Sequence, residues 1–185
     1  MSGINFLIFY SSELFKVLGK DKIMTIVIGL ANFGGSFIAT AVITRLGRKF
    51  NIVIGCLFQG IGMLLLFVGF QSDSFPILAS ACVIFVLSFA VGLGGSQMAY
   101  ISEILPPQGV AISCAVQWIM TAIIAQSLLT LKNLFGATAL ILFFTASCFV
   151  CALSLDYLMI ETKGKSSEVI AKQFQERRYR PFNFK

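Results

Sequence analysis

Five long apolar runs occupy most of the chain, and each is long enough to cross a lipid bilayer as a helix. They cover residues 23–44, 52–70, 76–105, 109–131 and 137–160. The hydrocarbon core of a bilayer is about 30 Å thick, and a helix crosses it with roughly 20 apolar residues. Unpaired backbone groups are costly in lipid, so a span must be helical unless its polarity alternates as in barrel strands, which these runs do not show. The runs therefore predict an all-α integral membrane protein.

Composition argues against the other broad classes of protein. Only 12% of the residues are charged, compared with roughly 25% in a soluble domain. The net charge of +6 does not indicate nucleic-acid binding, because the basic residues lie between the apolar runs and in the tail without interleaved aromatic residues. The chain has no histidine and no paired carboxylates within a run, which leaves little machinery for acid–base catalysis. We therefore expect neither an enzyme nor a metal or cofactor site.

The five cysteines all fall inside apolar runs. Their spacing matches neither a zinc site nor the disulfide framework of a secreted protein. We interpret Cys56, Cys82, Cys114, Cys148 and Cys151 as small residues of the helix core.

A sixth helix is predicted at the beginning of the chain. Residues 2–18 form a shorter apolar stretch that contains Glu13 and Lys16, and we interpret it as a helix whose first part is cut off. The prediction is a six-helix transmembrane bundle over residues 1–160, followed by a basic tail over 161–185. Lys and Arg concentrate in the 45–49 loop and in this tail, so the positive-inside rule predicts that both are cytoplasmic.

Polar residues inside the apolar runs are the first candidates for a binding site. The amides of Asn5, Asn32 and Gln117 are expensive in hydrocarbon unless each meets a partner or a wet cavity. An amide both donates and accepts hydrogen bonds, which suits a neutral hydroxylated ligand, while a hydrogen bond between helices is the alternative. Trp118 lies beside Gln117 and is suited either to stacking on the apolar face of a ring or to simple packing.

Glycines mark two further features. The run from Gly92 to Gly95 weakens the third span and predicts either a hinge or a place where two helices pack closely. Gly47 separates two arginines in the loop after the first long run, and the positive-inside rule explains the arginines without explaining the glycine.

Four short motifs occur in a fixed order along nearly the whole chain. They are SGIN at 2–5 followed by Phe9 and Tyr10, TRLGRK at 44–49, YISEILP at 100–106 and ETKGK at 161–165. In order and spacing they resemble helices seven to twelve of the sugar porter family of the major facilitator superfamily. Several positions depart from that pattern: two glutamines before SGIN are absent, Thr44 replaces an acid and Met98 replaces a tryptophan.

The resemblance implies a function and a set of site residues. It implies twelve helices in two halves, with a hexose-like sugar held between them and exposed alternately to each side of the membrane. This chain would supply the carboxy-terminal half of a transporter. The alternative is a truncated, non-transporting protein that is inert, or that pairs with or modulates a full-length relative. The expected partners are the sugar, the lipid bilayer and an amino-terminal half, in a multi-pass protein of the plasma membrane.

The residues that match the family's functional positions form two groups. The sugar-binding group comprises Asn5, Asn32, Phe89 and Trp118, together with Gln117, which stands where the family usually has an asparagine. The gating group comprises Tyr10, Arg45, Gly47, Arg48, Gly92, Gly94, Glu103 and Glu161. In the family, the acids at the positions of Glu103 and Glu161 meet arginines of the cytoplasmic loops when the inner gate is closed.

Overall fold

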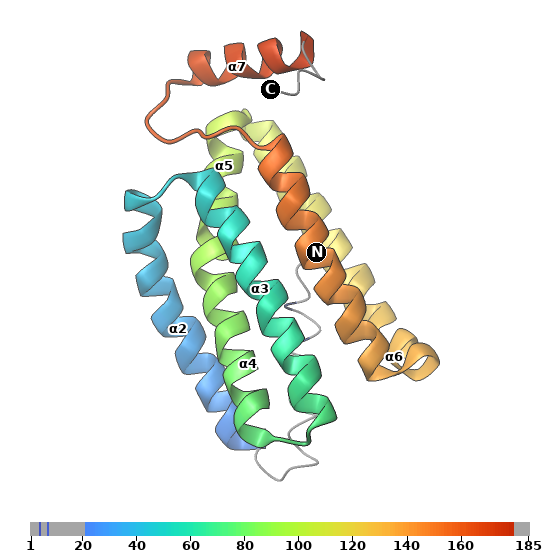
Figure 1. The fold of residues 1–185 in the computed structure, drawn as a ribbon. Helices are drawn as coiled ribbons and strands as arrows, with labels where there is room; N and C mark the ends of the chain where they lie inside the picture. The colour runs from blue at the N-terminus through green and yellow to red at the C-terminus, as the bar shows by residue number, and fades with distance from the viewer. Residues whose placement is uncertain (1–3, 5–6, 8–20, 180–185) are drawn as a thin grey trace.

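The computed structural model describes Ile4, Leu7 and residues 21–179, and every regular element within this part is a helix (Figure 1). The elements are α2 (Asp21–Arg45), α3 (Arg48–Gln71), α4 (Phe75–Ser88), the π-helix η1 (Phe89–Gly94), α5 (Gly95–Ile104), α6 (Pro107–Leu158) and α7 (Ser167–Tyr179). The all-α prediction is confirmed.

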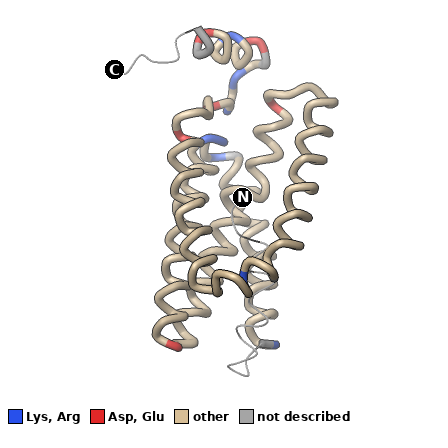
Figure 2. The backbone as a smooth tube through the Cα atoms, turned by 90° about the vertical axis from the view of Figure 1, so that its right-hand side faces the viewer, with Lys and Arg blue, Asp and Glu red and all other residues tan. Residues whose placement is uncertain are grey.

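The helices supply five segments long and apolar enough to cross a membrane. These are Lys22–Ile43, Arg48–Gln71, Phe75–Ile104, Pro107–Leu128 and Thr130–Leu158, which agree with the five predicted runs. Figure 2 shows charged residues gathered near the ends of these segments, with the middle of the bundle free of them. The sixth predicted helix, over 2–18, lies outside the described residues except for Ile4 and Leu7, which are helical.

Two consecutive predicted runs form one element in the structure. The helix α6 folds back on itself, so that its first half, which contains the apolar segment 107–128, and its second half, which follows Gly136, run antiparallel (Figure 1). Inside it, Gly136 has φ 80° and ψ 161°, a conformation that disfavours any residue with a Cβ. A single glycine thus provides the turn between two spans.

The core of the bundle forms around α3, which packs against α4, η1 and α6. Phe85 of α4 and Met63 of α3 are fully buried there, together with Ile141 of α6. Cys56, Cys82 and Cys148 are also buried, in agreement with the interpretation of the cysteines as core residues, whereas Cys114 and Cys151 are only partly buried. By contrast, residues 107–127 in the first half of α6 are all at least partly exposed.

The glycine run in the third span has a specific structure. Here α4 passes into the π-helix η1, and then into α5, without leaving the span. A Cβ built on Gly55 of α3 would lie 2.6 Å from the Cα of Gly92, and a Cβ on Gly92 would lie 2.5 Å from the Cα of Gly55. The two backbones are therefore in direct contact, which is the close packing predicted from the glycines, while a hinge at this position stays a prediction.

The tail after the last span contains the short helix α7, which lies across one end of the bundle (Figure 1). Hydrophobic residues at helical spacing predict such a surface helix over 166–178, and the structure confirms it. Ile170 faces the protein with 4% of its side chain exposed, whereas Val169 and Phe174 are exposed at 45% and 37%. We call this end of the molecule the α7 end.

Candidate functional site

At the α7 end, an ion pair joins the beginning of α3 to the last turn of α5. The guanidinium of Arg48 donates to Oε1 of Glu103 from Nη2 at 2.8 Å and from Nε at 3.0 Å. Both side chains are half-buried, with 21% and 28% exposed. Both residues belong to the predicted gating group, and the structure brings them together.

Glu161 follows α6 in sequence, and its carboxylate lies against the first turn of α3. Its Oε1 accepts hydrogen bonds from the backbone N–H groups of Arg48 at 2.8 Å and of Thr162 and Lys163 at 3.1 Å. The first N–H groups of a helix have no partner within the helix, and they attract negative charge. Gly47, at the N-cap position, has no side chain to satisfy them. A carboxylate from a distant part of the chain therefore caps α3.

The environment of Glu161 favours its charged form. Burial raises the pKa of this carboxyl, but hydrogen bonds from the backbone N–H groups of Lys163, Arg48, Phe50 and Thr162 outweigh burial, and the pKa is lowered. Its ionised form is thus the form that the fold stabilises.

The position of Glu161 explains Gly47, the glycine between two arginines. A Cβ on Gly47 would overlap the carboxyl group of Glu161. The backbone itself demands no glycine, because φ −70° and ψ 152° are open to any residue. The missing side chain leaves room for the acid that caps α3.

We expect Gly47→Ala to displace the Glu161 carboxylate and to lower the free energy of unfolding by about 1–3 kcal/mol at pH 7. The folded pKa of Glu161 lies below its unfolded value, so its stabilisation is present above the unfolded pKa and is lost as pH falls through the folded pKa. The cost of the substitution should therefore shrink in acid. Detergent-micelle unfolding as a function of pH measures this.

Gly34→Ala is the matched control, because a Cβ on Gly34 meets nothing within 4 Å. A helical Gly→Ala change there should leave stability unchanged or slightly raised. A pH-independent loss in Gly47→Ala, or an equal loss in Gly34→Ala, would contradict this account of the glycine.

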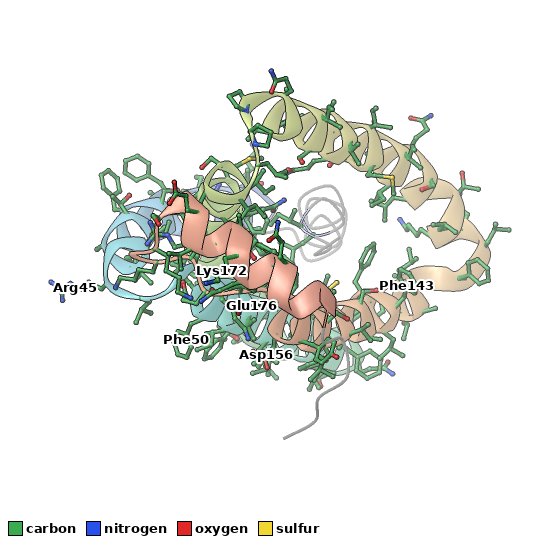
Figure 3. All side chains as sticks on the ribbon, turned by 90° about the horizontal axis from the view of Figure 1, so that it is seen from above. Arg45, Phe50, Phe143, Asp156, Lys172 and Glu176 are labelled. Atoms are coloured by element: carbon green, nitrogen blue, oxygen red, sulfur yellow. The ribbon has the colours of Figure 1, made fainter. Side chains whose placement is uncertain are left out.

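The remaining contacts of the α7 end differ in part from the expected pairing of acids with arginines. Glu161 contacts the backbone of Arg48, not a guanidinium. Arg45 accepts a hydrogen bond from Nζ of Lys163 through its carbonyl, and its side chain points away from the bundle in Figure 3. A second ion pair, Lys49–Asp156 at 2.9 Å, lies at the surface with Asp156 66% exposed.

The predicted sugar-binding residues lie on three elements. Asn32 is exposed on α2, Phe89 is the half-buried first residue of η1, and Gln117 and Trp118 are exposed on the first half of α6. Trp118 has 69% of its side chain exposed. Asn5, like Tyr10 of the gating group, lies outside the described residues.

Three buried or paired amides escaped the sequence analysis. Gln97 of α5 donates from Nε2 to Oε1 of Gln117 at 3.3 Å, and Asn51 of α3 bonds to η1 and α5. Gln59 is completely buried, and neither of its amide atoms has a hydrogen-bond partner within the described residues. The signal was available, because the cost of an amide in an apolar run applies to Gln59 and Gln97 as it does to Asn32.

This chain is similar in sequence to known sugar transporters. The model of a family described as "Sugar (and other) transporter" matches residues 1–174. The facilitated trehalose transporter Tret1 of Drosophila mojavensis is 30% identical, over 96% of this chain and 22% of its own length. Tret1 of Polypedilum vanderplanki is 31% identical, over 96% of this chain and 38% of its own length.

Solved structures of a sugar transporter are similar to this chain in fold. A double-tryptophan mutant of XylE superposes with a TM-score of 0.83 at 25% identity, over 93% of this chain and 39% of that one. The proton:xylose symporter XylE bound to 6-bromo-6-deoxy-D-glucose gives a TM-score of 0.81 at 26% identity, with the same coverage. The chain thus spans between about a fifth and two fifths of the proteins that it resembles.

Proposed function

Because this chain belongs to the sugar transporter family, we propose that it supplies the carboxy-terminal helices of a transporter that moves a hexose-like sugar by alternating access. The relatives named above are trehalose transporters, and XylE, a xylose symporter, shares the helical architecture of this chain. The amino-terminal half of the site would come from the remaining helices of a longer protein or from a separate chain. The chain itself is a multi-pass membrane protein and not an enzyme.

The exposure of polar side chains in the middle of apolar spans is the observation that supports this proposal best. Asn32 lies about midway along α2, and Gln117 and Trp118 lie about midway along the first half of α6. An amide that faced lipid at this depth would be costly, so such side chains face a watery cavity or another polar group. Amides and an indole are the kinds of side chain that suit a sugar, which offers hydroxyls at its edge and an apolar face.

The contacts at the α7 end fit a gate in this mechanism. The Arg48–Glu103 ion pair and the cap of α3 by Glu161 hold α3, α5 and the segment after α6 in one arrangement. Oε2 of Glu103 is buried without a hydrogen-bond partner in the described part of the chain, so the ion pair with Arg48 is made through Oε1 alone. Such contacts favour one of two arrangements and bias the alternating-access equilibrium. We place the α7 end in the cytoplasm and the protein in the plasma membrane.

The chain length supports a second candidate. Residues 1–185 correspond to less than half of the relatives, so a chain expressed alone would lack the opposite wall of the sugar site. In that form the protein would not transport, and it would be inert or would associate with an amino-terminal half.

Uptake of labelled sugar in vesicles tests both candidates. We expect uptake when the chain is joined to the amino-terminal half of a relative and none from the chain alone. Asn32→Ala in the joined protein should raise KM about tenfold or more, because two or more hydrogen bonds to sugar hydroxyls are lost.

Ser36→Ala is the control for this substitution. Ser36 is exposed one turn further along α2, and its hydroxyl donates to the carbonyl of Asn32 within the same helix. Its replacement should leave KM unchanged. Undiminished uptake with a native KM in Asn32→Ala would remove Asn32 from the site, and absence of uptake in the joined native protein would argue against transport.

A further inference from the structure

The amide of Asn51 connects α3 to two points of the third span. Its Nδ2 donates to the backbone carbonyl of Val91 in η1 at 2.8 Å and to Oγ of Ser96 in α5 at 2.6 Å. Asn51 is buried, with 4% of its side chain exposed, and Ser96 is completely buried. An amide this deep in the bundle is retained at a cost unless it is hydrogen-bonded, and here both donor hydrogens have acceptors.

The two acceptors are five residues apart, which is the repeat of a π-helix. A π-helix pairs residues i and i+5, whereas an α-helix pairs i and i+4. In an α-helix, residues five apart are turned about 140° from each other around the axis. One short side chain on a neighbouring helix would then reach only one of them. The contacts of Asn51 to Val91 and Ser96 are therefore specific to the π-helical register of η1.

The contact between Gly55 and Gly92, beside Asn51, sets the distance between α3 and η1. Gly55 follows Asn51 by one turn of α3, and Gly92 follows Val91, so the two backbones touch next to the hydrogen bonds. A Cβ on Gly92 would also lie 3.2 Å from the carbonyl oxygen of Asn51. Close approach brings the Val91 carbonyl within reach of a side chain as short as asparagine.

The register of η1 determines where the residues on either side of it lie. Return of one π-helical turn to an α-helix would rotate the following segment by about 100° and shift it about 1.5 Å along the axis. Phe89 stands at the beginning of η1, and Glu103 follows on α5. A change of register would therefore move Glu103 relative to Phe89 and away from Arg48 on α3.

We propose that Asn51 is a positioning residue that holds η1 in its π-helical register and thereby sets the placement of Phe89 and Glu103 relative to α3. The contacts of Asn51 with Val91 and Ser96 support the first part, that Asn51 keeps η1 π-helical, which we call the register lock. Its effect on transport rests on the proposed function of Phe89 and Glu103. The two parts are tested separately.

Hydrogen exchange of the purified chain in nanodiscs, followed by mass spectrometry, tests the register lock without any sugar. Asn51→Leu keeps the approximate size of the side chain and removes its donors. We expect the amides of residues 92–97 to exchange about tenfold or more faster than in the native chain. Ser96→Ala removes one acceptor with little change in volume, and it should accelerate the same amides by a smaller factor. This milder variant keeps the test decisive if Asn51→Leu fails to fold.

Gln59→Leu is the matched control, since Gln59 is a buried amide two turns further along α3 with no hydrogen-bond partner in the described structure. Its replacement should leave exchange at 92–97 unchanged. Native exchange rates in Asn51→Leu and Ser96→Ala, or an equal acceleration in Gln59→Leu, would overturn the register lock.

The transport readout uses the joined protein of the uptake experiment. Asn51→Leu should raise the sugar KM about tenfold, while Gln59→Leu should not change it. Faster exchange at 92–97 with a native KM would show that Asn51 secures η1 without positioning the site, and this would overturn the second part of the proposal. A joined native protein that moves no sugar would contradict the proposed function and leave the exchange result standing.

Discussion

Gly55→Val is expected to separate α3 from η1 and to destabilise the chain by about 3 kcal/mol or more. The Cβ of any larger residue at 55 would lie 2.6 Å from the Cα of Gly92 and 3.3 Å from the carbonyl oxygen of Ser88. Both obstacles are backbone atoms, so no side chain can rotate away, and the two elements must move apart. Overpacking of a core typically costs about 1–3 kcal/mol, and here the hydrogen bonds of Asn51 are lost as well.

Unfolding of the purified chain in mixed micelles measures this effect, and Gly29→Val on α2 is its control. A Cβ on Gly29 meets nothing within 4 Å, so the same substitution there should change stability by less than about 1 kcal/mol. Equal losses at the two glycines would mean that the contact between α3 and η1 does not limit stability.

Glu103→Gln is expected to change the ratio of inward-facing to outward-facing molecules of the joined transporter by about five- to thirtyfold. The substitution keeps the shape of the side chain but removes the charge that Arg48 meets through two hydrogen bonds to one oxygen. A half-buried pair of this kind contributes about 1–2 kcal/mol, and in the proposed gate that contribution exists only in the closed arrangement. The ratio is measured from distance distributions between two labels, one at the α7 end of this chain and one on the same side of the amino-terminal half.

Asp156→Asn serves as the control for Glu103→Gln. It removes the other described ion pair at this end, Lys49–Asp156, in which the acid is 66% exposed. Exposed pairs contribute little, so the populations should stay as they are in the native protein. Native populations in Glu103→Gln would remove this acid from the gate, and a shift of the same size in Asp156→Asn would show a general effect of charge.

The helical spans were predictable because the bilayer sets their length. Each of the five runs read from hydrophobicity agrees with a helix of the structure, and the surface helix α7 follows from the spacing of Val169, Ile170 and Phe174. The pairing of Arg48 with Glu103 came from motif resemblance, since the two residues are far apart in sequence. The types of side chain and their spacing along the sequence were sufficient to predict the spans, the helix α7 and this ion pair.

Features that depend on particular backbone atoms were not predictable. The glycine run at 92–95 indicated a weakened helix, but it did not distinguish a bend from a π-helix held by Asn51. The cap of α3 by Glu161 was missed for the same reason, because the expected partner of an acid was a cation and the actual partners are N–H groups of the main chain. The space beside Gly47 becomes visible only when the position of Glu161 is known.

The cap of α3 also bears on how the protein is made. Arg48 and Glu161 are 113 positions apart, so the ribosome completes the first turn of α3 long before it adds the acid that caps it. At about 5–20 residues per second, this delay is roughly 6–20 s. During that time, water or lipid headgroups must satisfy the open N–H groups of a helix that already lies in the membrane. The cap of α3 therefore forms only after residues 49–161, which include the four spans that follow Arg48, have been synthesised.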